Sequence, residues 1–402
     1  MESANSDKRN RLFWIWLGGL TLSLLGTQVL TYSLTWTAAG ISGALSGFVL
    51  TATALPRLLL AMPAGAIADR VGPWRIMLIS DTTMFLVAIA TVVVAYLTSS
   101  VAPWILVVIG LCIGTSDAFY RPSSGAAPRL LVPASYLGQA TAARQAINQV
   151  VGFVGPALAG IVVATFALSG SGLVSSATFL SMAILLFICR SSLRQVQPRE
   201  SHSPFFQDMW AGVTTAFKIP AVRTILLLLA ATAGFVLPLT TLLTPLIGHE
   251  RGWTGGETGL VSGSFAAGLG VAALLIFFAG STWLNQIPAV TGLIVSGSGI
   301  VLVALAPQFW MASLCAMVAG FGAGTFTVRS AAALLRDTPE EYTSRIQAAA
   351  LLAQTLPVLV TNNILGPLSD TLTPTAVTSG CGVTALAIGL ISLAIRPSRN
   401  IG

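Results

Sequence analysis

Four charged residues lie inside long apolar runs of this chain, and their side chains are the ones best placed to do chemistry. Arg57, Asp81, Asp117 and Arg121 each interrupt a stretch dominated by Leu, Val, Ile, Ala and Gly. An ionisable group in such surroundings needs either a partner or a task. Asp117 and Arg121 are four residues apart, which places them on one face of a helix. A carboxylate in this position can bind and release a proton as its surroundings change between wet and dry.

Two hypotheses follow for these four residues, whose formal charges cancel. In the first, Asp117 is the proton-carrying carboxylate of an intramembrane charge network. In the second, the network is a permanent set of salt bridges that braces neighbouring helices, because arginines close to Asp117 would keep it ionised. The residue types and spacing leave both hypotheses open.

The overall composition explains why these charges stand out. Of the 402 residues, 54% are apolar and 8% are charged, whereas soluble domains carry about 25% charged residues. A soluble globule with this composition would leave large apolar patches exposed to water. The apolar runs are continuous over about 20 residues rather than alternating, so they predict membrane-spanning helices and not a barrel.

We therefore predict an all-α membrane protein with about twelve transmembrane helices in two six-helix bundles. Outside the predicted spans, Lys and Arg fall in the termini and even-numbered loops, and the odd-numbered loops contain only Arg251, which predicts cytoplasmic termini. The predicted domains are 1–190, a cytoplasmic linker with an interfacial helix at 191–220, and 221–402. The predicted spans are 11–38, 44–64, 75–97, 103–125, 139–167, 172–188, 222–247, 257–279, 287–306, 309–335, 344–372 and 375–395.

The loop between the second and third predicted spans carries the most specific pattern in the chain. It contains Gly65, Asp69, Arg70, Gly72 and Arg75. These residues resemble the signature of the major facilitator superfamily, although the two positions after Gly72 depart from its usual basic pair. The resemblance implies two pseudo-symmetric bundles that work by alternating access, with this loop as a gating motif.

The chemistry of that loop suits a gate. Gly65 would permit a close approach between helices, and Gly72 would permit a tight turn. Asp69 would face the N-terminus of a helix in the other half of the chain, a contact that would hold a cytoplasmic gate closed. The simpler interpretation, a charged loop that only fixes topology, explains fewer of these matches.

Further motifs resemble the branch of that family that contains macrolide efflux and enterobactin export proteins. In the fifth span, Gly152, Gly155, Pro156 and Gly160 are similar to the motif of drug:proton antiporters, which usually ends in paired glycines. The resemblance implies proton-driven efflux across the plasma membrane, which in bacteria is the inner membrane. Packing alone explains glycine and proline in a membrane helix equally well.

The resemblance also places the substrate path between the two bundles at mid-membrane. The apolar and aromatic character there favours a hydrophobic or amphipathic substrate such as a drug, an antibiotic or a siderophore-like molecule. Hydrogen bonds between helices explain the asparagines among the candidates as well as ligand contact does. The candidate cavity residues are Gln28, Tyr32, Trp36, Asn148, Thr240, Thr241, Asn362 and Asn363.

Other classes of protein find less support. We expect no enzyme activity, catalytic residue, metal or cofactor, because His, Asp and Glu form no cluster and no nucleotide-binding loop occurs. The net charge of +7 suits anionic lipid rather than nucleic acid. The expected partners are a small-molecule substrate, protons and membrane lipid, and the expected state is a monomer. The alternative function is a proton-coupled uptake symporter for a small metabolite.

Overall fold

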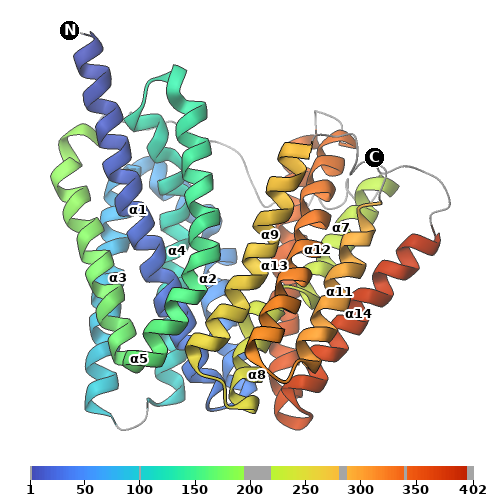
Figure 1. Ribbon diagram of the computed structural model, residues 1–402. Helices are drawn as coiled ribbons and strands as arrows, with labels where there is room; N and C mark the ends of the chain where they lie inside the picture. The colour runs from blue at the N-terminus through green and yellow to red at the C-terminus, as the bar shows by residue number, and fades with distance from the viewer. Residues whose placement is uncertain (1, 99–100, 194–218, 280–287, 339–341, 396–402) are drawn as a thin grey trace. The chain divides into compact units, whose positions relative to one another are not determined.

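The computed structural model describes residues 2–98, 101–193, 219–279, 288–338 and 342–395 (Figure 1). Within these residues the chain is helical, with short connections. The elements are α1 (Glu2–Ala39), α2 (Gly43–Val71), α3 (Pro73–Leu97), α4 (Pro103–Leu131), η1 (Ala134–Tyr136), α5 (Leu137–Leu193), α7 (Pro220–Phe235), η2 (Leu239–Leu243), α8 (Thr244–Arg251), α9 (Gly255–Ala279), α11 (Val290–Leu305), α12 (Phe309–Arg336), α13 (Thr343–Thr371) and α14 (Pro374–Ile395).

Ten stretches of the described chain are helical, long and apolar enough to cross a membrane. One of them, Ala134–Cys189, has 56 residues, far more than the about 20 that one crossing needs. Ala167 breaks it with a φ of 53° and a ψ of −160°, so it supplies two crossings. The 16-residue helix α11 is apolar but shorter than the rest. Counting both halves of α5 and including α11 confirms the predicted all-α fold with about twelve spans.

The largest departure from the predicted spans is in the seventh. Instead of one helix over 222–247, the chain forms α7, a π-helical turn at Leu239–Leu243, and then α8. Pro238 and Pro245 flank this turn and lack the N–H groups that a regular helix would use. The interfacial helix predicted at 191–220 falls mostly on 194–218, outside the described residues.

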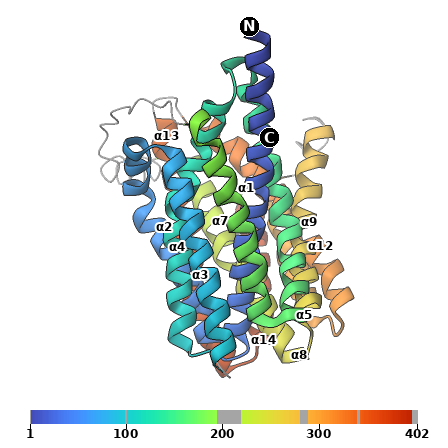
Figure 2. The same cartoon turned by 90° about the vertical axis from the view of Figure 1, so that its left-hand side faces the viewer.

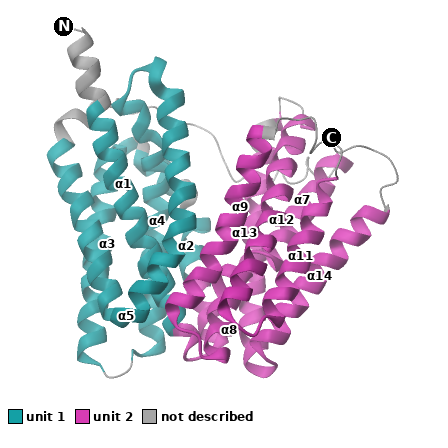
Figure 3. Ribbon diagram, in the orientation of Figure 1, with its two compact units in different colours: residues 1–37, 51–202 teal, residues 38–50, 203–402 magenta. Residues whose placement is uncertain are grey.

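Internal contacts divide the chain into two compact units (Figure 3). Unit 1 comprises Met1–Thr37 and Thr51–His202, and unit 2 comprises Ala38–Leu50 and Ser203–Gly402. The end of α1 and the first turns of α2 therefore group with unit 2, although the rest of both helices belongs to unit 1. The predicted domain boundary within 191–220 stays a prediction.

In unit 1, helix α3 packs along α4 and α5 (Figure 2). An apolar cluster fills one end of this arrangement, with Phe13 and Trp16 of α1 buried against Met77 of α3 and Met182 of α5. Large side chains thus fix α1, α3 and α5 against one another, and the polar residues described below lie further along the same helices.

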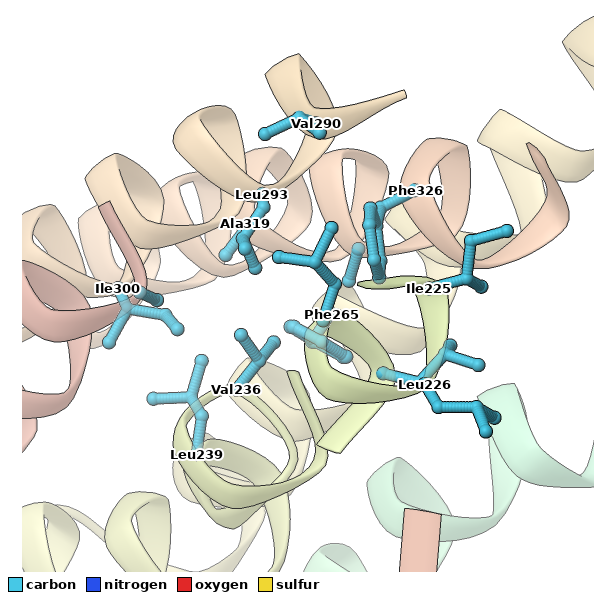
Figure 4. Packing of buried hydrophobic residues seen from close by; sticks show 14 of the residues in the cluster. Ile225, Leu226, Val236, Leu239, Phe265, Val290, Leu293, Ile300, Ala319 and Phe326 are labelled. Atoms are coloured by element: carbon cyan, nitrogen blue, oxygen red, sulfur yellow. The ribbon is translucent and has the colours of Figure 1, made fainter. Parts of the chain in front are cut away.

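In unit 2, helix α12 packs against both α9 and α11 around a large apolar cluster (Figure 4). Phe265, Leu293 and Phe326 are among its buried members. The α9–α12 crossing is close, because a methyl group at Gly268 or Gly320 would collide with a backbone carbonyl of the facing helix. Small residues that allow such approach are the usual means of packing helices within a membrane.

Candidate functional site

Asp117 on α4 forms ion pairs with two arginines of unit 1. Its Oδ2 atom lies 2.7 Å from Nε of Arg57, on α2, and 2.8 Å from Nε of Arg121, one turn further along α4. Arg121 donates a hydrogen bond to it, whereas Arg57 makes the ion pair without a well-aligned hydrogen bond from Nε. The Asp117 side chain is 9% exposed, against 33% for Arg57 and 68% for Arg121. These three predicted network residues therefore meet.

Asp81 on α3 is more deeply buried, at 1% exposed, and its close partners are neutral. Ser23 of α1 donates a hydrogen bond of 2.6 Å to its Oδ1 atom. The Tyr120 hydroxyl of α4 lies beside both groups. Within the described residues, neither this hydroxyl nor Oδ2 of Asp81 has a hydrogen bond of normal length and angle, and no ion pair reaches Asp81. The predicted network of four residues thus divides into an ion-paired trio and a separate carboxyl group.

Both carboxyl groups line one cavity of about 20 Å³ in unit 1. Hydroxyl groups from Ser23 and Thr27 of α1 and from Ser116 and Tyr120 of α4 line it as well. About 10–15 Å³ is enough for one water molecule when polar partners are present. The site can therefore hold a proton, or a water molecule that delivers one.

Sequence analysis did not single out the hydroxyl groups around Asp81. Two spacings would have indicated them. Ser23 and Thr27 are four residues apart on α1, and Tyr120 follows Asp117 by three residues on α4, so each pair shares a helix face.

The predicted gating loop is described in part. Gly72 joins α2 to α3 with a φ of 96°, a conformation that glycine adopts readily, and Pro73 begins α3. Arg70 and Arg75 are exposed. A methyl group on Gly65 would meet no atom within 4 Å in the described part of the chain, so the close helix approach predicted there is not observed. The side chain of Asp69 lies outside the described residues.

The antiporter-like motif lies in the first half of α5 and contacts α1. A methyl group on Gly155 would lie 2.9 Å from Cγ of Gln28, so glycine makes room for that predicted cavity residue. Pro156 is inside the helix and Gly160 is buried. Gly152 has open space around it within the described residues.

The remaining cavity candidates of unit 1 lie near this contact. Tyr32 belongs to an apolar cluster with residues of α5 such as Ala159, and Trp36 packs against it. Asn148 is half-buried on α5. In this structure the aromatic candidates of α1 therefore serve packing between α1 and α5.

The cavity candidates of unit 2 make mostly local hydrogen bonds. Thr240 and Thr241 donate to the Leu237 carbonyl at the π-helical turn. Asn363 donates from Nδ2 to the carbonyl one turn earlier, at 2.7 Å. Asn362 is 3% exposed, and its Oδ1 atom has no hydrogen-bond partner within the described residues.

A second group of charges, not anticipated from the sequence, lies at helix ends of unit 2. The Arg251 guanidinium donates to the carbonyls of Ala304 and Ala306 at the end of α11, and its Cζ atom lies 5.2 Å from the centre of the Trp253 ring. Glu250 accepts hydrogen bonds of 2.9 and 2.7 Å from the backbone N–H and hydroxyl of Thr375. These charged side chains form hydrogen bonds with backbone groups that have no partner within their own helix, at the end of α11 and the start of α14.

Asp370, near the end of α13, also caps a helix. Its two carboxylate oxygens accept hydrogen bonds of 2.6 and 2.8 Å from the backbone N–H groups of Gly43 and Ala44 at the start of α2. A carboxylate at a helix N-terminus offsets the positive end of the helix dipole. Its role is therefore accounted for by backbone capping.

Known proteins agree with this architecture. The sequence model of the Major Facilitator Superfamily matches residues 16–362. The uncharacterized MFS-type transporter YfiS of Bacillus subtilis (strain 168) is 25% identical over 354 residues, covering 85% of this chain and 82% of that protein.

Several solved structures share the fold at low identity. A bacterial homologue of the iron transporter ferroportin, in an inward-facing state, has a TM-score of 0.71 at 16% identity and covers 95% of this chain and 98% of its own. The nucleoside transporter NupG has a TM-score of 0.71 at 13% identity, covering 97% and 99%. A POT family transporter in complex with 5-aminolevulinic acid has a TM-score of 0.70 at 13% identity, covering 94% and 95%. Because the family model spans most of the chain and the fold agrees, this protein belongs to the Major Facilitator Superfamily and is a multi-pass membrane transporter of that type.

Proposed function

We propose that this transporter exports hydrophobic or amphipathic small molecules across the plasma membrane by proton antiport. It works by alternating access as a monomer, with both termini in the cytoplasm. The molecules exported are of the drug, antibiotic or siderophore-like kind, and resistance to several toxic compounds is the expected phenotype.

The observation that carries the proton-coupled mechanism is the pair of buried carboxyl groups in unit 1. Asp81 and Asp117 are 1% and 8% exposed, and both line the same polar cavity within the helices that cross the membrane. Burying an ionisable group at such depth costs free energy, so residues of this kind usually occur where they serve a function. Proton relays are a common function of this kind. A carboxyl group that alternates between two surroundings can take up a proton on one side of the membrane and release it on the other.

The substrate class is supported by the interior of the described chain. Its most deeply buried charged residues are the acidic Asp81 and Asp117. The partly exposed Arg57 and Arg121 are already paired with Asp117 rather than free to bind an anion such as a phosphate ester. Tyr32 and Trp36 of α1, which the sequence made candidates for the cavity, contribute to an apolar cluster between α1 and α5. Apolar and aromatic walls with few polar groups are typical of sites for hydrophobic ligands.

The proposed direction of transport, out of the cell, is supported by the resemblance of the Gly155–Pro156 segment to drug:proton antiporters. A proton-coupled uptake symporter would use the same carboxyl groups, so the sign of the coupling has to be measured. The test uses purified protein in liposomes, an imposed pH gradient, a membrane potential clamped with valinomycin and potassium, and ethidium as the probe.

Antiport predicts that ethidium accumulates when the liposome interior is acidic, because protons leave as the dye enters. Symport predicts accumulation when the exterior is acidic. Ethidium carries a permanent charge and is not trapped by protonation, and protein-free liposomes control for leakage. Transport of ethidium without dependence on the pH gradient would contradict proton coupling.

A further inference from the structure

We propose that the transported proton resides on Asp81, and that Asp117 stays ionised as the fixed counter-ion of Arg57 and Arg121. This inference rests on the proton-coupled function proposed above and assigns its two carboxyl groups different tasks. Proton uptake converts the Asp81 carboxylate into a neutral carboxyl group, and no other bond changes.

Asp117 is poorly suited to carry the proton because of its two arginine neighbours. Arg57 and Arg121 place cationic nitrogens 2.7 and 2.8 Å from the same oxygen of Asp117. Protonating Asp117 would discard both ion pairs and leave two positive charges facing each other. Losing the charge of a buried carboxylate that holds two partly exposed arginines is unfavourable.

Asp81 has partners that suit both of its protonation states. Ser23 and Tyr120 carry hydroxyl groups, which can donate or accept a hydrogen bond. When Asp81 is ionised, both hydroxyls can donate to it, and when it is protonated, its new O–H can be donated to Tyr120. The carboxyl group can therefore gain and lose a proton without leaving a buried charge or a buried donor unmatched.

The cavity supplies space for a water molecule beside the carboxyl group. Oδ2 of Asp81 and the Tyr120 hydroxyl are buried and lack well-aligned hydrogen bonds in the described residues. Both residues line the cavity of about 20 Å³, which is large enough for one water molecule. A water molecule there would bond to both atoms and pass a proton to Oδ2.

The charges around Asp81 make both states accessible. The elements that line the cavity bring to it Asp117 and Tyr120 of α4 as the other titratable groups, while α1 contributes Ser23, Leu24 and Thr27 and α5 contributes Phe179. Arg57 and Arg121 are held near the cavity by their ion pairs with Asp117. Together the three side chains carry a net charge of about +1 when all are ionised. This excess favours ionised Asp81, whereas burial away from bulk water favours the protonated form. A residue that carries a proton needs such opposing effects, because both its ionised and its protonated form must be accessible.

The direct test is infrared difference spectroscopy of the purified, detergent-solubilised protein as a function of pH. The wild type should show the carbonyl band of a protonated carboxyl group that appears as the pH falls. Asp81→Asn should lack this band, and Tyr120→Phe should retain it with a shifted midpoint. A band that persists in Asp81→Asn and disappears in Asp117→Asn would overturn the proposal.

Transport measurements distinguish an error in the assignment of the proton to Asp81 from an error in the proposed antiport function. In liposomes, Asp81→Asn should move ethidium down its own gradient while losing the component driven by the pH gradient. If wild type shows no pH-driven component, antiport fails, and the infrared titration still decides where the proton binds. If Asp81→Asn keeps the pH-driven component, antiport stands and the assignment to Asp81 is wrong. Thermal unfolding of each variant identifies a folding defect, and Asp81→Glu, which restores a carboxyl group, should recover the band where Asn folds poorly.

Discussion

The interiors of the two units differ in how they use charge. Within the described residues, the buried charged side chains, Asp81 and Asp117, both belong to unit 1. Unit 2 buries hydroxyl groups and the amide of Asn362, together with its large apolar cluster. Its acidic residues Glu250 and Asp370 are exposed and bind helix ends.

This difference indicates a division of tasks. A carboxyl group inside the membrane responds to protons, whereas a close glycine crossing or a capped helix end contributes only to stability. We therefore expect substitutions of the unit 1 carboxyl groups to change the response to pH. Substitutions in unit 2 should change stability and leave that response intact. The following changes test the comparison, from the largest expected effect to the smallest.

The largest effect is expected where unit 2 depends on backbone packing. A methyl group at Gly268 would collide with the Met317 carbonyl, whereas Gly270, on the same helix, has open space around it in the described structure. Gly268→Val should lower the free energy of unfolding by about 3 kcal/mol, because it forces α9 away from α12. Gly270→Val is the matched control and should melt like wild type in detergent. Equal losses in both variants would contradict the packing argument.

The next effect concerns the ion pairs of unit 1. Asp117→Asn leaves both arginines without their carboxylate, and since these are partly exposed the free energy of unfolding should fall by about 2 kcal/mol rather than the full cost of a buried unpaired charge. The double variant Asp117→Asn with Arg57→Gln should lose less than the sum of the two single changes. Additive losses would show that the Arg57–Asp117 contact contributes nothing.

A smaller effect is expected at the end of α11. Arg251→Gln removes the guanidinium that binds carbonyls there, and this should lower the free energy of unfolding by about 1.5 kcal/mol. Arg223→Gln, an exposed arginine on α7, is the control and should change it by less than about 0.5 kcal/mol. The pH-driven transport of both variants should match wild type. An altered pH response in Arg251→Gln would break the proposed division of tasks.

The smallest effect is expected at Asp370. Asp370→Ala removes the cap from Gly43 and Ala44 and should lower the free energy of unfolding by about 1 kcal/mol. Asp370→Asn keeps an acceptor oxygen and should lose less. Urea or thermal titration of the three proteins side by side measures the difference. A larger loss in the Asn variant than in the Ala variant would show that capping is not the role of this residue.

The sequence predicted the fold well because length and hydropathy decide where helices cross a membrane. The ion pair between Asp117 and Arg121 was also predictable, since both lie on one helix at a fixed spacing. The contact with Arg57 was expected only as part of the four-residue charge network.

Other features depend on tertiary packing and could not be foreseen. Asp81 differs from Asp117 because of Ser23 and Tyr120, which come from other helices. The corner at Ala167, in contrast, lies where the fifth predicted span ends, with Gly170 and Gly172 shortly after it, although the positive φ falls on the alanine itself. Gly65 matches a family motif, yet a methyl group added there would meet no atom within 4 Å in the described structure.

The cap on Arg251 has a consequence for the biogenesis of the protein. The carbonyls that bind this guanidinium lie more than fifty residues later in the chain, and Thr375 lies 124 residues later. While the ribosome is still making α9, the positive charge at the end of α8 has none of these partners. The segment α7–α8 is therefore made before Arg251 has its carbonyl partners, with Glu250 and Trp253 as its neighbours in the chain, and the cap forms only after α11 has been made.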